Sequence, residues 1–166
     1  MRHVYLVGLP GSGKSTLGRA LAAALERPFV DLDDVIEARA GRAIRDIFAT
    51  EGEAHFRTLE RAALAATAAR TEPLVVATGG GTPCFLDNGA LLKNTGTSVF
   101  LDVPVATIVA RLEADDPTVR PLLHNQKIKY RLEQLSADRR AYYLEADVHL
   151  SGNNLAAEAV LAQLSC

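Results

Sequence analysis

The sequence is poor in cysteine and has no long apolar run. Cys84 and Cys166 are its two cysteines, too few for a disulfide framework, and no His or Cys pair has the spacing of zinc ligands. Both are therefore expected to be free thiols. Nothing approaches the length of a segment that spans a bilayer, and the N-terminus enters a strand pattern without the regions of a signal peptide. We expect a cytoplasmic protein that does not contact a membrane.

An excess of charge of one sign is also absent. The formal net charge is −2, with acidic and basic residues interspersed. The sequence therefore offers no basic field for nucleic acid and no polybasic cluster for an anionic membrane. No repeat or low-complexity linker divides the 166 residues, which fit one domain, 1–166, around a single core. Small-molecule partners are favoured, and the expected state is a monomer.

Residues 8–16 read Gly-Leu-Pro-Gly-Ser-Gly-Lys-Ser-Thr, a complete phosphate-loop motif. An apolar run precedes the motif and a helical pattern follows it, which is the context that such a loop needs. The loop's backbone N–H groups would point at phosphates, with the positive end of the helix behind them. Lys14 would bring a positive charge to the phosphates, and the Ser15 hydroxyl suits Mg²⁺. The alternative is a glycine turn that binds nothing, and the lysine, the serine and both flanks disfavour it.

Apolar runs of strand length alternate with longer segments of helical spacing. The runs lie at residues 4–7, 29–32, 74–77, 98–101 and 148–150. This alternation predicts an α/β fold, with a central five-stranded parallel sheet flanked by helices. Ligand sites in such sheets lie beyond the carboxyl ends of the strands, so the residues directly after each run are candidates for function.

Acidic residues follow the second predicted strand. Side chains alternate along a strand, so Asp31 and Asp33 are expected on the same side of its carboxyl end. One could hold Mg²⁺ through water, and the other could accept a hydrogen bond from a substrate hydroxyl. The alternative is an N-cap for a helix at residues 35–40. Because capping needs only one carboxylate, we assign it to Asp34 and assign chemistry to Asp31 and Asp33.

Two further features would shape a pocket for an organic acid. Arg57 and Glu60 lie one turn apart on a predicted helix at residues 53–69. The Glu60 carboxylate could hold the guanidinium and leave its other donors for a substrate carboxylate, although spacing alone fits a solvated salt bridge equally well. Three glycines at 79–81 follow the third predicted strand. They remove every side chain there, so the backbone can approach a substrate closely.

Four arginines late in the chain are candidates for ligand contacts, two of them as alternatives for one role. The polar segment at residues 113–125 is interpreted as an irregular, mobile lid, whose Arg120 would swing onto the transferring phosphoryl group. Arg111, on the preceding helix, could line the nucleotide base. A basic helix is expected at 128–143, where Arg139 and Arg140 are alternatives for a second arginine that binds an anionic substrate. Asp102, after the fourth predicted strand, is interpreted as a structural turn residue.

In this order, the motifs resemble the shikimate kinases, small phosphate-loop enzymes of aromatic amino-acid biosynthesis. The resemblance covers nearly the whole chain. It rests on the phosphate loop, Asp31-x-Asp33, Phe56-Arg57-x-x-Glu60, Gly79-Gly80-Gly81, Arg120-Pro121-Leu122-Leu123, and Arg139 four residues before Tyr143. Pro10 stands where the family often has methionine, and Arg-Arg-Ala-Tyr-Tyr at 139–143 replaces the more common Arg-x-Pro-Leu-Tyr. The doubled arginine leaves the choice between Arg139 and Arg140 open.

The resemblance implies a P-loop kinase fold with a lid at about residues 113–125. It implies ATP-dependent phosphorylation of the 3-hydroxyl of shikimate, with one Mg²⁺ ion held by Ser15 and Asp31. The residues expected to bind ATP are Gly11, Ser12, Gly13, Lys14, Ser15, Thr16, Arg111 and Arg120. Those expected to bind shikimate are Asp33, Arg57, Gly79, Gly80, Gly81 and Arg139. Lys14, Asp33 and Arg120 are the expected catalytic residues, with Asp33 as the hypothetical base.

Two alternatives stay open. Another small-molecule kinase with the same core, such as a gluconate kinase or a nucleoside monophosphate kinase, would keep the phosphate loop but would not need the Phe-Arg and triple-glycine features. A nucleotide-binding switch that transfers no phosphate would need neither a lid arginine nor a pocket for a second substrate.

Overall fold

The computed structural model describes residues 2–115 and 121–164. In chain order the elements are β1 (His3–Val7), α1 (Lys14–Ala24), β2 (Phe29–Asp31), α2 (Leu32–Ala40), α3 (Ile44–Ala68), β3 (Val75–Ala77), the short 3₁₀ helix η1 (Thr82–Cys84), α4 (Asn88–Thr95), β4 (Gly96–Asp102), α5 (Val105–Asp115), α6 (Pro121–Tyr143), β5 (Val148–Ser151) and α7 (Ala157–Leu164). Strands and helices alternate as the sequence predicts. The predicted strands differ from these only at their ends.

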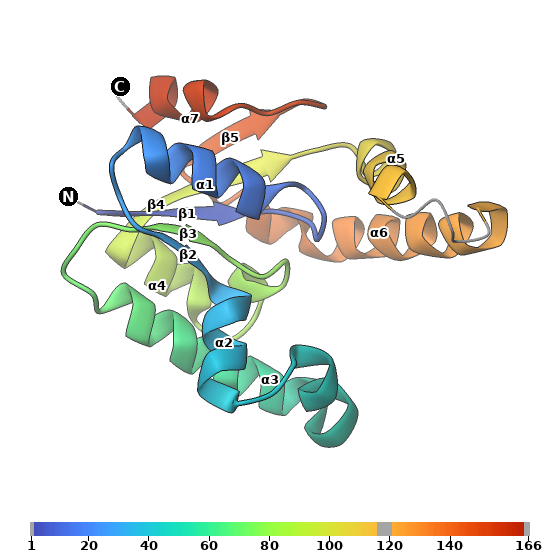
Figure 1. Ribbon diagram of the computed structural model, residues 1–166, viewed down its shortest axis with the longest axis horizontal. Helices are drawn as coiled ribbons and strands as arrows, with labels where there is room; N and C mark the ends of the chain where they lie inside the picture. The colour runs from blue at the N-terminus through green and yellow to red at the C-terminus, as the bar shows by residue number, and fades with distance from the viewer. Residues whose placement is uncertain (1, 116–120, 165–166) are drawn as a thin grey trace.

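The strands form the predicted five-stranded parallel sheet, in the order β2-β3-β1-β4-β5. β1 lies at the centre, with β3 on one side and β4 on the other (Figure 1). The chain builds one half of the sheet first and then crosses β1 to build the other half. A reversal of this kind leaves a crevice at the carboxyl end of the central strand, where the loop before α1 lies.

The side chains of β1 alternate between two hydrophobic cores. Val4 and Leu6 pack in a cluster with residues of α1 and α7, whereas Tyr5 and Val7 pack in a second cluster with residues of α2, α3 and α6. Figure 1 shows α1 and α7 over one face of the sheet and α3 and α4 over the other. Both faces are covered, which explains the continuous apolar runs at Val4–Val7 in β1 and throughout β3. None of the helices in the described residues is long and apolar enough to cross a membrane.

The start of α2 corrects one assignment. The helix begins directly after β2, and its N-cap is Asp31, not Asp34. Asp31 has extended backbone angles, and its carboxylate accepts a hydrogen bond from the Asp33 N–H at 3.1 Å. The strand is therefore one residue shorter than predicted, and Asp33 lies in the first turn of the helix, not on the strand.

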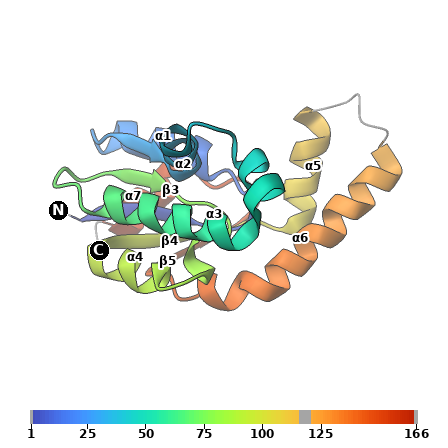
Figure 2. The ribbon, with the colours of Figure 1, turned by 90° about the horizontal axis from the view of Figure 1, so that it is seen from below.

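The helices after β4 are longer than predicted. α5 continues to Asp115 and α6 begins at Pro121, so the predicted irregular segment at 113–125 is helical at both ends. Proline suits the first position of a helix, where the missing N–H would have no intrahelical acceptor. Figure 2 shows α5 and α6 projecting together beyond the sheet. Helices that project beyond the sheet bury less apolar surface, and the polar composition of these segments therefore resembled that of a loop.

Candidate active site

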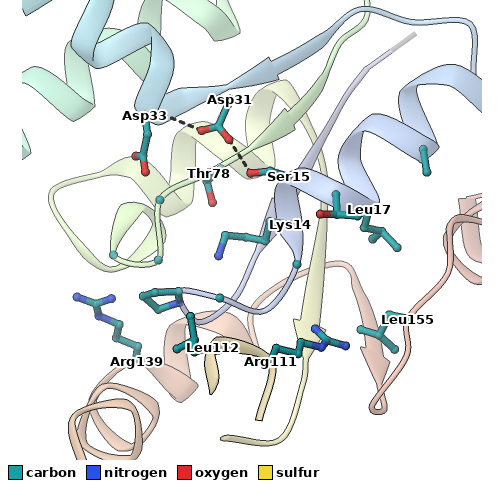
Figure 3. A pocket seen from close by; sticks show the side chains of 18 of the residues that line it. Lys14, Ser15, Leu17, Asp31, Asp33, Thr78, Arg111, Leu112, Arg139 and Leu155 are labelled. Atoms are coloured by element: carbon teal, nitrogen blue, oxygen red, sulfur yellow. Dashed lines mark hydrogen bonds between the residues drawn. The ribbon is translucent and has the colours of Figure 1, made fainter. Parts of the chain in front are cut away.

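A cleft of about 1040 Å³ opens beyond the carboxyl ends of the strands. Figure 3 shows Lys14 and Arg139 in one part of it and Arg111 with Leu155 in another. The sequence-predicted site residues that line the cleft are Gly11, Gly13, Lys14, Ser15, Thr16, Asp31, Asp33, Arg57, Gly79, Gly80, Gly81, Arg111 and Arg139. Ser12 is buried within the loop and does not line the cleft. The predicted Arg120 lies outside the described residues.

Lys14 is the first residue of α1, and its ammonium is buried in the phosphate loop. Gly13 caps the helix with a left-handed φ of 90°, a conformation that glycine adopts without strain. Lys14 Nζ donates hydrogen bonds to the carbonyls of Gly8 and Leu9 at 2.9 and 2.8 Å. Burial lowers the pKa of Lys14 to about 8, against the opposing charges of Asp33 and Asp31. A buried ammonium of this kind gains from any anion that can replace the loop carbonyls.

Ser15 and Asp31 form a hydrogen-bonded pair of oxygen groups beside the loop. Ser15 Oγ donates to Asp31 Oδ2 at 2.6 Å, so its lone pairs stay available to a cation. Among residues 2–115 and 121–164, no cluster of three or more His, Cys, Asp or Glu could hold a metal ion by itself. Mg²⁺ bound with a nucleotide keeps several waters and needs only one or two protein oxygens, and the pair therefore fits that ion.

Asp33 has an environment that brings its titration close to neutral pH. Burial, followed by the nearby charges of Asp31 and Glu60, raises the pKa of Asp33 to about 6, although Lys14 opposes the shift. Its carboxylate lines the same cleft as Lys14 (Figure 3). A carboxylate with such a pKa can accept a proton near neutral pH.

Arg57 is held by two carboxylates of its own helix. Its Nη1 donates to Glu60 Oε2 at 2.9 Å, while Nε and Nη2 donate to Glu53 Oε1 at 3.2 and 3.0 Å. The side chains of Arg57 and Glu60 are only 10% and 1% exposed, which excludes the solvated salt bridge that spacing alone allowed. The guanidinium also lies over the Phe85 ring at 3.9 Å. Of its five N–H donors, two remain for a ligand once these three bonds to described residues are counted.

The three glycines after β3 are packed against the side chains of the site. A Cβ on Gly81 would lie 2.6 Å from Arg57 Nη2, and one on Gly79 would lie 2.9 Å from Glu60 Oε1. A Cβ on Gly80 would lie 2.8 Å from the Pro10 ring. Each distance is shorter than real contacts of a Cβ, so the absence of side chains is what brings these groups to the loop.

Adjacent arginines on α6 face different partners. Arg140 donates two hydrogen bonds to the Asp102 carboxylate, at 2.9 and 2.7 Å. This ion pair agrees with the structural role predicted for Asp102. Arg139 lines the cleft beside Gly80. Of the two arginines, Arg139 is therefore the one available to a ligand in the cleft.

The family model of the shikimate kinases matches residues 10–165. This chain belongs to the shikimate kinase family. Curated shikimate kinases support the assignment: that of a Sulfurihydrogenibium species is 43% identical over 92% of this chain and 89% of its own length. The shikimate kinase of Gloeobacter violaceus is 44% identical over 98% of this chain and 90% of its own length. Family membership makes the chain an ATP-dependent kinase, as the sequence predicts.

Solved structures agree with the assignment. The shikimate kinase from Acinetobacter baumannii in complex with shikimate matches with a TM-score of 0.85 and 37% identity, covering 99% of this chain and 91% of that chain. A gluconokinase from Sinorhizobium meliloti matches with a TM-score of 0.59 and 19% identity, covering 98% of this chain and 93% of that one. At 19% identity, the similarity to the gluconokinase shows only that the two proteins share a fold.

Part of one wall of the cleft was not found by sequence reasoning. Arg111, which the sequence predicts beside the nucleotide base, lines this wall, and its Nη2 donates to the carbonyl of Asn153. Beside it lies Leu155 (Figure 3), followed by Ala156 and by the first two residues of α7, Ala157 and Glu158. Leu155 also packs against the hydrophobic cores. Its sequence signal is therefore that of an ordinary core leucine, and nothing in the pattern indicated a ligand site.

Binding of ATP should weaken as the pH rises above 8. The pKa of Lys14 is about 8, so the unliganded protein loses the ammonium above this value, whereas a bound phosphate would hold the proton and keep the pKa higher. The affinity should therefore approach a loss of about tenfold per pH unit between these two pKa values. Calorimetric titration with Mg²⁺ and a nonhydrolysable ATP analogue at several pH values measures this slope. A flat affinity across that range would contradict the role of Lys14.

Proposed function

We propose that this chain transfers the γ-phosphate of ATP to the 3-hydroxyl of shikimate, giving shikimate 3-phosphate. One observation carries the proposal: a single cleft contains the phosphate loop together with Asp33, Arg57 and Arg139, which come from three different helices. Shikimate is a small carboxylate with three hydroxyls. Two arginines match its acid group, and an aspartate matches a ring hydroxyl. The shikimate bound to the related Acinetobacter enzyme supports this choice of substrate.

In this proposal, the acid end of the cleft orients shikimate. Arg57 offers the carboxylate its two remaining N–H donors, from a guanidinium that Glu53 and Glu60 already fix. Arg139 adds a second positive charge from α6. The glycine loop contributes backbone, without side chains that would occupy the space of the ring. Because the guanidinium is fixed before binding, little conformational entropy is lost when the carboxylate binds.

The phosphate loop binds and neutralises the nucleotide. Lys14 exchanges the carbonyls of Gly8 and Leu9 for phosphate oxygens. One Mg²⁺ ion bound by Ser15 directly, and by Asp31 through water, would supply further neutralisation of the β- and γ-phosphates. Arg111 and the neighbouring wall receive the base. Arg120, from a lid that joins α5 and α6, would contribute charge to the transferring group.

Asp33 is the proposed proton acceptor. As the 3-hydroxyl oxygen bonds to the γ-phosphorus, its proton passes to the Asp33 carboxylate and the bond to the ADP oxygen breaks. Phosphoryl transfer depends mainly on positioning and charge neutralisation, so Asp33 also serves by holding the hydroxyl in line.

The proposed reaction predicts ADP release that depends on shikimate. Purified protein with ATP and Mg²⁺ should release ADP in a coupled assay when shikimate is added, because the cleft offers Arg57 and Arg139 to its carboxylate and Asp33 to a ring hydroxyl. Gluconate is the matched control, since it is an acid used by a kinase that shares the fold. Equal turnover with gluconate, or ADP release that is independent of either acid, would contradict the proposal.

Asp33→Asn should lower kcat by about 10³-fold while the ATP analogue still binds, because an amide cannot accept the proton. In the unchanged chain, Asp33 becomes protonated as the pH falls below about 6. The logarithm of kcat/KM for shikimate should therefore fall with a slope approaching one below that pH. Steady-state kinetics across pH measure both effects. Turnover near that of the unchanged chain in Asp33→Asn would remove Asp33 from the mechanism.

Arg57→Ala should raise the KM for shikimate about hundredfold, with a much smaller effect on the KM for ATP. The change removes two charge-assisted hydrogen bonds to the acid and leaves the phosphate loop intact. Arg61→Ala is the matched control, because Arg61 lies one turn further along α3 and pairs with the exposed Asp87 outside the cleft. Similar increases in the two KM values for Arg57→Ala would mean that the clamp is misassigned.

A further inference from the structure

Glu60 is the most deeply buried member of the arginine clamp, and both of its carboxylate oxygens have a donor. The residue is 1% exposed. Its Oε2 accepts from Arg57 Nη1 at 2.9 Å, and its Oε1 accepts from Thr82 Oγ1 at 2.7 Å. A buried carboxylate is costly unless its oxygens are paired, so the orientation in which both bonds form is strongly favoured. The plane of the Glu60 carboxylate is therefore set by two groups, of which only Arg57 faces the ligand.

The position of the Thr82 side chain is fixed by burial and by hydrogen bonds of its backbone. Thr82 is fully buried at the start of η1, directly after the glycine loop, and its N–H donates to the Gly79 carbonyl at 3.1 Å. Its own carbonyl accepts from Asn88 Nδ2 at 2.9 Å, from a second fully buried residue. A β-branched side chain has few χ1 options, and its hydroxyl therefore has a defined position once the backbone is fixed. The chain of bonds from Asn88 to Arg57 runs entirely through the interior.

We propose that Thr82 is a positioning residue for carboxylate recognition: its hydroxyl fixes Glu60, and Glu60 in turn aims the free N–H donors of Arg57 into the cleft. This inference rests on the proposed function, since it assigns a specificity role within the shikimate site. Thr82 does not line the cleft, so its hydroxyl is not placed to contact the substrate. Its effect should appear only through the group that Arg57 binds, the carboxylate of the substrate.

The decisive experiment compares Thr82→Val with Thr82→Ser. Valine keeps the branched shape but leaves Glu60 Oε1 without its donor, whereas serine retains the hydroxyl. We expect Thr82→Val to raise the KM for shikimate about tenfold and the KM for ATP less than about twofold, from the loss of one hydrogen bond to a charged group. Thr82→Ser should restore the KM for shikimate to within about threefold of that of the unchanged chain. If the valine variant does not fold, as judged by its melting curve, Thr82→Ala takes its place.

A second measurement distinguishes a change in the orientation of Arg57 from a general loss of structure in the site. The dissociation constants of shikimate and of its uncharged carboxamide are measured by calorimetry for the unchanged chain and for the hydroxyl-free variant. The variant should lose about tenfold affinity for the acid and less than about threefold for the amide, because only the acid forms an ion pair with Arg57, with both carboxylate oxygens as acceptors. Equal losses for the two compounds, or an unchanged KM for shikimate, would overturn the inference alone. Absence of shikimate-dependent turnover in the unchanged chain would overturn the proposed function, and the inference with it.

Discussion

The close approach of side chains to the backbone at 79–81 determines the shape of the site. Atoms of Arg57, Glu60 and Pro10 each lie within 2.9 Å of the position that a Cβ on one of these glycines would take. The loop therefore brings α3 and the phosphate loop into contact with the end of β3, through which the two halves of the cleft meet. A side chain at position 80 would press on the Pro10 ring, and one at 79 or 81 would displace the carboxylate of Glu60 or the guanidinium of Arg57. Displacement by even about an ångström matters, because phosphoryl transfer depends on the alignment of its reactants.

Burial disfavours the charged forms of two groups in the site, Lys14 and Asp33. It is the largest cause of both the low pKa of Lys14 and the raised pKa of Asp33, and each of these groups partly opposes the shift of the other. The protein thus holds an ammonium and a carboxylate that are each less stable than in water. This desolvation reduces the stability of the folded protein, and phosphate binding offsets the cost for Lys14. A hydroxyl proton offsets it for Asp33, so the same burial favours both binding and proton transfer.

Sequence patterns predicted the features that depend on local order. The phosphate loop, the sheet and the spacing of Arg57 and Glu60 follow from motifs and periodicity. Prediction was weaker where one residue has two roles. Asp31 both caps α2 and accepts from Ser15, whereas the sequence pattern led us to separate these roles and to assign the cap to Asp34. Thr82 carried no signal, because a hydroxyl next to a glycine loop is ordinary until the fold brings Glu60 beside it.

The choice between the two arginines of α6 shows how tertiary contacts decide what a sequence leaves open. Successive helical residues point about 100° apart, so only one of a pair can face the cleft. Asp102, at the end of β4, accepts from Arg140 with both oxygens, while the buried Leu132 and Tyr143 pack α6 into the core. Arg139 and Tyr143, four residues apart, then share a face. The Tyr143 hydroxyl donates to the Gly80 carbonyl at 2.5 Å, and Arg139 lies beside the same glycine. One helix face thus supplies both a charge for the substrate and an anchor for the loop that contacts it.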